Sequence, residues 1–213
     1  EIARPRYLDQ ELIELPSMAL GRARMELGHM GGIVDGMLEN IKPALQGRDL
    51  GGLARGFDQI VVLRDAVLVY LQKVGRHEFS DLEAGEHARL VTATGELEGM
   101  AAAISRDLAP LVAEFETAKI VLSKETAELL ERLLQAIEES ARSALHALVE
   151  RDEQAAQAVL AKRGEIAGLT AEVQQLQAAR LAQDDPDRFT KHRLQIELLD
   201  RLRRIYSVSE HMA

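Results

Sequence analysis

The sequence predicts an all-α protein made of two tandem three-helix bundles, with six long antiparallel helices. Two stretches, one in each half of the chain, carry apolar residues at the same intervals of three and four. Those residues are Leu27, Met30, Val34, Leu38, Ile41 and Leu45 in the first stretch, and Leu130, Leu133, Ile137, Ala141, Ala144 and Leu148 in the second. Such spacing forms one apolar stripe along a helix. Both stretches end in an Arg-Asp pair before another helical pattern, and this repeat indicates a duplicated architecture.

The composition favours a globular helical protein with an aliphatic core. The chain has 213 residues, of which 46% are hydrophobic, 29% are charged and only 3% are aromatic. No alternating strand pattern competes with the helical spacing. The formal net charge of -9 opposes binding to DNA or RNA, because phosphate contacts on nucleic acids need clustered Lys and Arg. The chain has no Cys, which excludes disulfides and thiolate ligands.

The first two helices are predicted from proline placement and apolar spacing. Residues 1–15 mix charge and scattered apolar side chains, so we expect an irregular N-terminal segment there. Pro16 suits the first turn of a helix, where its missing N–H group costs nothing. This first helix is expected to run to about Gln46. The second helix should follow the polar turn at 47–49 and end near Gly75.

The third helix is expected to begin at a capping box formed by Ser80 and Glu83. Pro110 lies within its apolar pattern. We expect Pro110 to kink or break this helix, because proline lacks an N–H donor and its ring clashes with the preceding turn. These three helices make up the first predicted unit, residues 16–118.

The second predicted unit, residues 119–213, repeats this plan. Ser123 is the expected N-cap of the fourth helix, and the fifth helix is expected over roughly residues 152–182. Asp185 and Pro186 read as the N-cap and first-turn proline of the sixth helix. The short connections between helices favour antiparallel neighbours.

The sequence contains no recognisable catalytic motif. The glycines are scattered through helical patterns and form no nucleophile elbow, phosphate-binding loop or dinucleotide fingerprint. We therefore expect a protein that is not an enzyme. Glu26 and His29 have the Glu-x-x-His spacing of ferritin-like di-iron sites, but such sites need two pairs and the sequence offers one. A ferritin-like metal-binding bundle is the less favoured alternative.

Three carboxylates are the candidate metal ligands. Asp58, Glu96 and Glu98 lie in helical segments that should meet in the first three-helix unit. Carboxylates that converge between helices can bind a hard or borderline cation through oxygen. Glu96 and Glu98 are two positions apart, however, and so do not share one helix face.

Two stretches of sequence resemble a known family. These are PRYLDQELIELPSMALGRARMELGHMGGIVDGML and the later GRDLGGLARGFDQIVVLRDAVLVYLQKV. They resemble the PhoU-like domain attached to bacterial sodium/phosphate cotransporters, which shares the P-x-Y-L-D segment, the Pro-led helix and the Tyr-Leu pair near the end of the second helix. The resemblance implies the same two tandem three-helix bundles. It also implies a regulatory domain that restrains or senses phosphate uptake.

The resemblance further implies a location and a partner. The domain would lie at the cytoplasmic face of the cell membrane and dock on the membrane-spanning transporter domain of the same polypeptide. The chain starts at Glu1 and not at Met, so we expect it to be part of a longer polypeptide whose membrane part precedes it. Aliphatic helical surfaces often pair, and a homo-oligomer is a further possible partner state.

The acidic motifs of that family are incomplete in this chain. Asp58 matches a leading acid in the second helix, but Val61 stands where the next acid belongs. Glu96 and Glu98 match the acids of the third helix, whereas Ala102 replaces its closing Asp. A multinuclear cluster needs most of its anionic ligands. We therefore expect no full cluster and no other cofactor, with room for a single divalent, iron or zinc ion at the three remaining carboxylates.

These observations lead to one expected function and one main alternative. The favoured function is a non-catalytic regulatory domain of a sodium-dependent phosphate transporter that modulates phosphate uptake by docking. The alternative is a structural or protein-interaction bundle without a role in transport. Interruption of the stripes by Pro110, Pro186 and several Gly argues against one continuous coiled coil.

Overall fold

The computed structural model describes residues 3–45, 50–120, 122–181 and 188–213. These residues are mostly helical and include no β-strand, which confirms the predicted all-α class. A short 3₁₀ helix, Gln10–Leu12, precedes the longer helices. The remaining helices, in chain order, are α1 (Pro16–Glu39), α2 (Ile41–Leu45), α3 (Leu50–Val74), α4 (Asp81–Ala102), the π-helical η2 (Ala103–Leu108), α5 (Ala109–Thr117), α6 (Lys124–Glu150), α7 (Glu153–Ala161), α8 (Arg163–Leu181) and α9 (Arg188–Met212).

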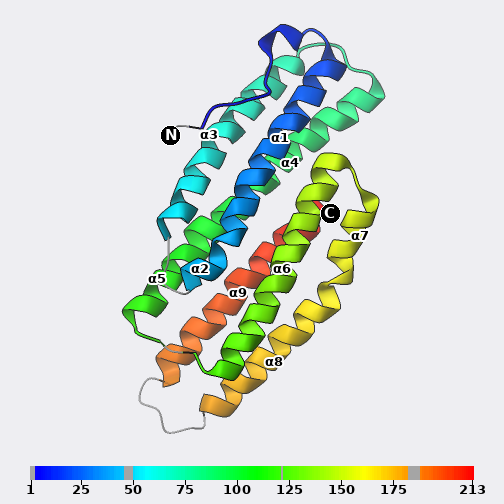
Figure 1. Ribbon diagram of the computed structural model, residues 1–213. Coiled ribbons are helices and arrows are strands. Elements are labelled where there is room, and N and C mark those ends of the chain that lie inside the picture. Colours follow the sequence, from blue (N-terminus) through cyan, green and yellow to red (C-terminus); the bar gives the residue numbers. More distant parts are fainter. Residues whose placement is uncertain (1–2, 46–49, 121, 182–187) are drawn as a thin grey trace.

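In the part of the chain that the structure describes, the helices form two bundles that pack against each other (Figure 1). In the first bundle α1, α3 and α4 contact one another, and η2 and α5 continue the line of α4. In the second bundle α6 contacts α7, α8 and α9, and α8 also contacts α9. The bundles meet where α1 lies along α6 and where α9 lies against α4 and η2. This arrangement agrees with the duplicated architecture that the repeat predicts.

The helix caps expected from sequence form as predicted. The Ser80 hydroxyl accepts a hydrogen bond from the backbone N–H of Glu83, and the Glu83 carboxylate accepts one from the backbone N–H of Ser80 at 2.9 Å. These bonds to Ser80 lower the pKa of Glu83. The Ser123 hydroxyl accepts a bond from the backbone N–H of Thr126 at 3.3 Å and starts α6.

Two predicted helices are shorter than expected. The first helix ends at Glu39 and not near Gln46, because the side-chain amide of Asn40 donates to the carbonyl of Gly36 at 2.8 Å. The helix expected over 152–182 is interrupted at Lys162, which separates α7 from α8. Gln46, the turn at 47–49 and the Asp185-Pro186 cap lie outside the described residues.

The predicted distortion at Pro110 takes the form of the π-helical segment η2, directly before the proline. A proline ring clashes with the carbonyl four residues earlier, which here belongs to Arg106, and proline cannot donate to it. A π-helical turn holds an additional residue per turn and so moves this carbonyl out of register with the ring. Pro110 then occupies the first turn of α5, where a missing N–H group is tolerated.

The core is aliphatic and runs through both bundles. The largest fully buried side chain described within it is that of Tyr70, which is 1% exposed and donates a hydrogen bond from its hydroxyl to the carbonyl of Asp9 at 2.9 Å. Burial raises the pKa of Tyr70. In the described part of the chain, no helix combines the length and apolar character needed to span a membrane.

Candidate functional site

The structure places the three sequence-predicted metal ligands apart from one another. Asp58 is exposed on α3 and lines a shallow hollow beside α1, whereas Glu96 on α4 lines a different hollow. Glu98 forms an ion pair with Arg64 of α3. Within the described residues, no group of three or more His, Asp or Glu side chains could hold a metal ion. The structure therefore does not bring Asp58, Glu96 and Glu98 together as a site.

The Glu26 and His29 pair holds the N-terminal segment in place. Glu26 is fully buried, and its Oε2 accepts hydrogen bonds from the backbone N–H groups of Arg6 at 2.8 Å and Tyr7 at 2.7 Å. His29 Nδ1 lies 2.8 Å from Glu26 Oε1. The ring of Tyr7 packs edge-on against the ring of His29. These partners occupy both oxygens of Glu26, so the pair fastens residues 6 and 7 to α1.

A cluster of three arginines around one buried carboxylate lies where the two bundles meet. Glu86 of α4 is 7% exposed. Its Oε1 accepts a hydrogen bond from Arg24 Nε of α1 at 3.2 Å, and its Oε2 accepts one from Arg89 Nη2 at 3.4 Å. Glu86 Oε2 also pairs with Arg151 Nη2. We call these four residues the arginine cluster.

Local structure fixes each member of the arginine cluster. Glu86 and Arg89 lie one turn apart on α4, soon after its capping box. Arg151 is the C-cap of α6, and its φ of 59° places it in the left-handed region that usually takes glycine. A non-glycine residue costs about 1–2 kcal/mol in that conformation. Arg151 nevertheless occupies it, and its guanidinium reaches Glu86 across the boundary between the bundles.

The residue after Arg151 completes the turn between α6 and α7. The Asp152 carboxylate accepts hydrogen bonds from the backbone N–H groups of Gln154 at 2.9 Å and Ala155 at 3.2 Å, and so caps α7. It also lies 3.3 Å from His146 Nε2. The bonds from Ala155 and Gln154 lower the pKa of Asp152. These bonds hold the Asp152 carboxylate at the N-terminus of α7.

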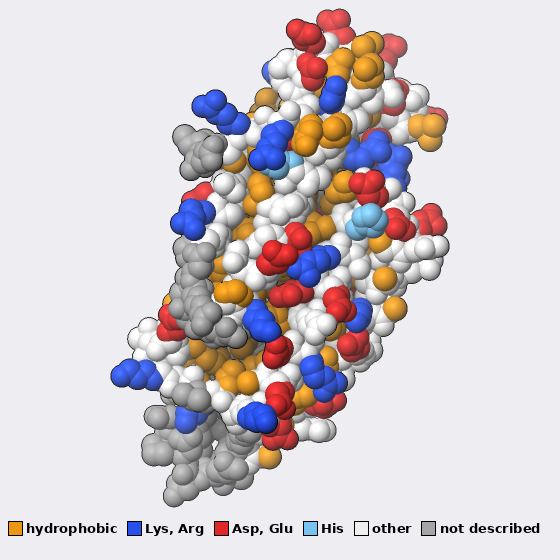
Figure 2. All heavy atoms as spheres, in the orientation of Figure 1, with side chains coloured by type: hydrophobic (Ala, Val, Ile, Leu, Met, Phe, Trp, Pro, Cys, Tyr) orange, Lys and Arg blue, Asp and Glu red, His pale blue; other side chains and the backbone are white. Residues whose placement is uncertain are grey.

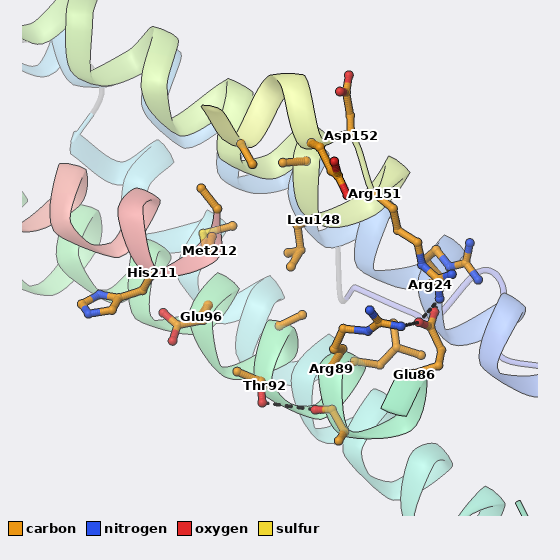
Figure 3. A pocket seen from close by; sticks show the side chains of 17 residues that line it. Arg24, Glu86, Arg89, Thr92, Glu96, Leu148, Arg151, Asp152, His211 and Met212 are labelled. Atoms are coloured by element: carbon orange, nitrogen blue, oxygen red, sulfur yellow. Dashed lines mark hydrogen bonds and ion pairs between the residues drawn. The ribbon is translucent and has the colours of Figure 1, made fainter. Parts of the chain in front are cut away.

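A hollow of about 510 Å³ opens beside the arginine cluster (Figure 3). The cluster lies at one end of this hollow, and Glu96 and His211 lie at the other end. Leu148 lies between the two ends in Figure 3, and the apolar lining of the hollow also includes Leu90, Ala93, Ala147, Ala156 and Met212. Pockets of about 300–1,000 Å³ that combine apolar walls with a few placed polar groups are typical sites for small molecules.

The three guanidinium groups of the arginine cluster present positive charge and hydrogen-bond donors that suit an anion. Three guanidinium groups face one carboxylate, so the cluster carries an excess of positive charge in a chain whose formal net charge is -9. Guanidinium groups stay protonated in proteins and offer only hydrogen-bond donors. Planar guanidinium groups bind carboxylate and phosphate groups with two parallel hydrogen bonds.

The cluster has no signature in the amino-acid sequence. Arg24 lies 62 positions before Glu86, and Arg151 lies 65 positions after it, so no local motif connects them. In the sequence, the Arg151-Asp152 pair marks only the polar end of the second apolar stretch. Arg151 can pair with Glu86 only because the end of α6 lies close to α4 in the folded chain.

The chain is partly similar to two curated bacterial proteins. It is 27% identical over 105 residues to a Salmonella typhimurium protein and 28% identical over 97 residues to an Escherichia coli K12 protein. Both carry the name "Putative inorganic phosphate export protein YjbB". The matches cover 48% and 45% of this chain but only 19% and 18% of those proteins. No protein-family model matches the chain, and no solved structure matches it.

Proposed function

We propose that this chain is a non-catalytic regulatory module of a phosphate transport protein. The similarity to two proteins named for the export of inorganic phosphate is the observation that carries this proposal. The matched part spans less than a fifth of each of them, so we assign to the chain a regulatory share of transport and not the transport step. The family resemblance implies sodium-coupled uptake of phosphate. Flux measurements with and without a sodium gradient distinguish this uptake from export.

The proposed partner is the membrane-spanning part of the same polypeptide, on the cytoplasmic side. Leu15, Met18 and Met25 lie at or near the start of α1 and are 52%, 54% and 47% exposed. Figure 2 shows hydrophobic side chains gathered over this end of the molecule. Exposed apolar patches mark contact surfaces. We call these three residues the α1 patch and propose that it docks on the membrane part.

Docking can regulate transport only through contacts that differ between two states of the transporter. A coupling of about 1 kcal/mol between the α1 patch and the transport cycle changes an equilibrium about fivefold. Such coupling needs no chemistry in the helical module. It needs a rigid surface, and the packed helices of the first bundle provide one.

The test compares phosphate flux through the complete gene product with and without the α1 patch. Radiolabelled phosphate is followed into and out of proteoliposomes, at matched protein amounts and with or without a sodium gradient. We expect Met18→Glu with Met25→Glu to change the flux by about fivefold, as the coupling above requires. The control is Val69→Glu, which places the same charge on an exposed apolar position of α3 and should leave the flux unchanged.

Each outcome of this test decides the proposal. Unchanged flux in the double variant, or an equal change in the Val69→Glu control, would contradict regulation by docking of the α1 patch. Absence of phosphate flux in the unmodified protein would contradict the assignment to phosphate transport. A sodium requirement would support uptake as the transported direction, and net efflux without sodium would support export.

A further inference from the structure

We propose that the arginine cluster is a binding site for a phosphate group of a small anionic molecule, with the rest of that molecule in the adjoining hollow. As a statement about regulation this inference rests on the proposed function, because it names the signal that the module would receive. The binding itself is a property of this chain and can be measured without any transport.

The donor groups of the cluster support this inference. Each guanidinium has five N–H donors. Among the described residues, Glu86 accepts hydrogen bonds from Arg24, Arg89 and Arg151. Its two carboxylate oxygens cannot accept bonds from most of the N–H groups of these three arginines. Arg24 uses Nε in this contact, which leaves its two terminal nitrogens. Glu86 therefore holds the three groups close together, and most of their N–H donors are left over for a ligand.

The charge balance supports a dianion. Three guanidinium groups and one carboxylate carry two net positive charges at neutral pH, and a phosphate monoester carries up to two negative charges. The side chain of Glu86 is 9% exposed, and electrostatic attraction is stronger near such a partly desolvated group than in water. A ligand with a phosphate group would neutralise this local excess.

The acidic residues around the hollow set the orientation of the ligand. Glu96, Asp152 and Glu153 also line it. Asp152 is bound to the start of α7, and Glu96 lies at the end opposite the arginines in Figure 3. An anionic group is therefore favoured at the arginine end and disfavoured near Glu96. The apolar lining of the hollow suits an uncharged organic part.

The position of the site connects binding to the arrangement of the two bundles. Arg24 and Glu86 belong to the first bundle, whereas Arg151 belongs to the turn between α6 and α7 of the second. A phosphate group that contacts all three arginines would replace part of the Glu86 interaction and add a bond between the bundles. Occupancy would thus favour the arrangement in which α4 and the α6–α7 turn are close.

Isothermal titration calorimetry on the full 213-residue chain tests the site with defined probes. The probes are inorganic phosphate, adenosine monophosphate, and adenosine without phosphate. We expect both phosphate-bearing probes to bind, with affinity falling as salt rises, because the contact is electrostatic. Adenosine alone should not bind measurably. Tighter binding of adenosine monophosphate than of inorganic phosphate would identify an esterified ligand, and the reverse would identify free phosphate.

Matched arginine variants locate the binding. Arg89→Gln should weaken binding about tenfold or more, as expected for the loss of a charge-assisted hydrogen bond. Arg89 is 68% exposed, so this variant should fold like the unmodified chain. Arg24→Gln serves as a second variant on a different helix. The control Arg132→Gln removes one positive charge from an exposed position of α6 and should leave the affinity unchanged apart from a small uniform effect.

The results separate this inference from the proposed function. Binding of neither phosphate probe, or binding that survives both Arg24→Gln and Arg89→Gln, would overturn the site. If the site fails while the α1 patch variants still alter phosphate flux, the proposed function stands without it. If phosphate binds as described while the flux does not depend on the α1 patch, the site stands and the proposed function falls.

Discussion

Buried carboxylates in this protein act through the donors that surround them. Glu26 accepts hydrogen bonds from two backbone N–H groups and therefore fixes the path of the N-terminal segment. Glu86 accepts hydrogen bonds from three guanidinium groups and therefore joins side chains from α1, α4 and the end of α6. A buried carboxylate without such partners would be strongly unfavourable. The two residues thus share the same chemistry, and their neighbours give them different roles.

Glu138 provides a test of pH dependence at the residue scale. It is half-buried on α6, and this desolvation raises its pKa above the ordinary value of 4.5, with nearby Arg142 and Lys42 acting in the opposite direction. At neutral pH this carboxyl is ionised in the folded chain. Because its pKa is raised there, this ionisation lowers the stability of the folded state. That loss of stability disappears as the pH falls below the ordinary value. Glu138→Gln should therefore increase the free energy of unfolding at pH 7.

The measurement is urea unfolding of Glu138→Gln from pH 7 to about pH 4, where the gain over the unmodified chain should shrink. The neighbouring Glu139 is the matched control, because its hydrogen bond with Lys162 lowers its pKa. Glu139→Gln should therefore lose stability at pH 7, and this loss should also fade as the pH falls through the lowered value. Changes of the same sign in the two variants would contradict the assigned causes.

At the scale of single helices, glycines have two different roles. Gly56 on α3 lies against the buried side chain of Met37, and a Cβ there would come within 2.5 Å of Met37 Cγ. Gly95 on α4 is exposed, and a Cβ there would meet no atom within 4 Å. The first glycine permits close approach of α1 and α3, whereas the second only weakens its helix.

These two glycines predict opposite effects of the same substitution. Gly56→Ala should lower the free energy of unfolding by about 1–3 kcal/mol, because the added methyl group overpacks the contact with Met37. Gly95→Ala should raise it by about 0.5–1 kcal/mol, because alanine restricts the unfolded chain and favours the helix. Thermal and urea unfolding followed by circular dichroism measures both. A stabilising Gly56→Ala would show that Met37 moves aside without cost.

At the scale of the whole molecule, the boundary between the bundles combines apolar packing with ion pairs. Leu145 of α6 is 7% exposed and lies over Gly31 of α1, where a Cβ would be 3.7 Å from Leu145 Cδ2. Nearby, Arg142 Nε lies 2.6 Å from Asp35 Oδ1. On the other side of the boundary, Arg204 of α9 pairs with Asp107 of η2 at 2.9 Å.

We expect the apolar contact at this boundary to contribute more stability than the ion pair beside it. Leu145→Ala should cost about 2–5 kcal/mol, because it leaves a cavity against α1. Arg142→Ala should cost about 1 kcal/mol or less, because its side chain is 41% exposed and the pair is screened by solvent. Urea unfolding of the two variants at low and high salt provides the comparison. A larger loss for Arg142→Ala would show that charge pairing dominates the boundary.

Much of this architecture could be predicted from the amino-acid sequence alone. The three-and-four spacing from Leu27 onward predicts α1, and Ser80 and Ser123 predict the starts of α4 and α6, because both signals depend only on residues within a few positions. The distortion near Pro110 follows from covalent structure. The break after Glu39 does not follow from apolar spacing, because it depends on a side-chain hydrogen bond of Asn40 that competes with the helix.

The candidate site was decided by tertiary structure. The sequence placed its chemistry at Asp58, Glu96 and Glu98, which lie in separate surroundings in the folded chain. Periodicity tells which face of a helix is buried, but it does not tell which charged residues of distant helices meet at a boundary. The meeting of Arg24, Glu86 and Arg151 depends on how α1, α4 and α6 cross, and that crossing is set by the packing of both bundles together.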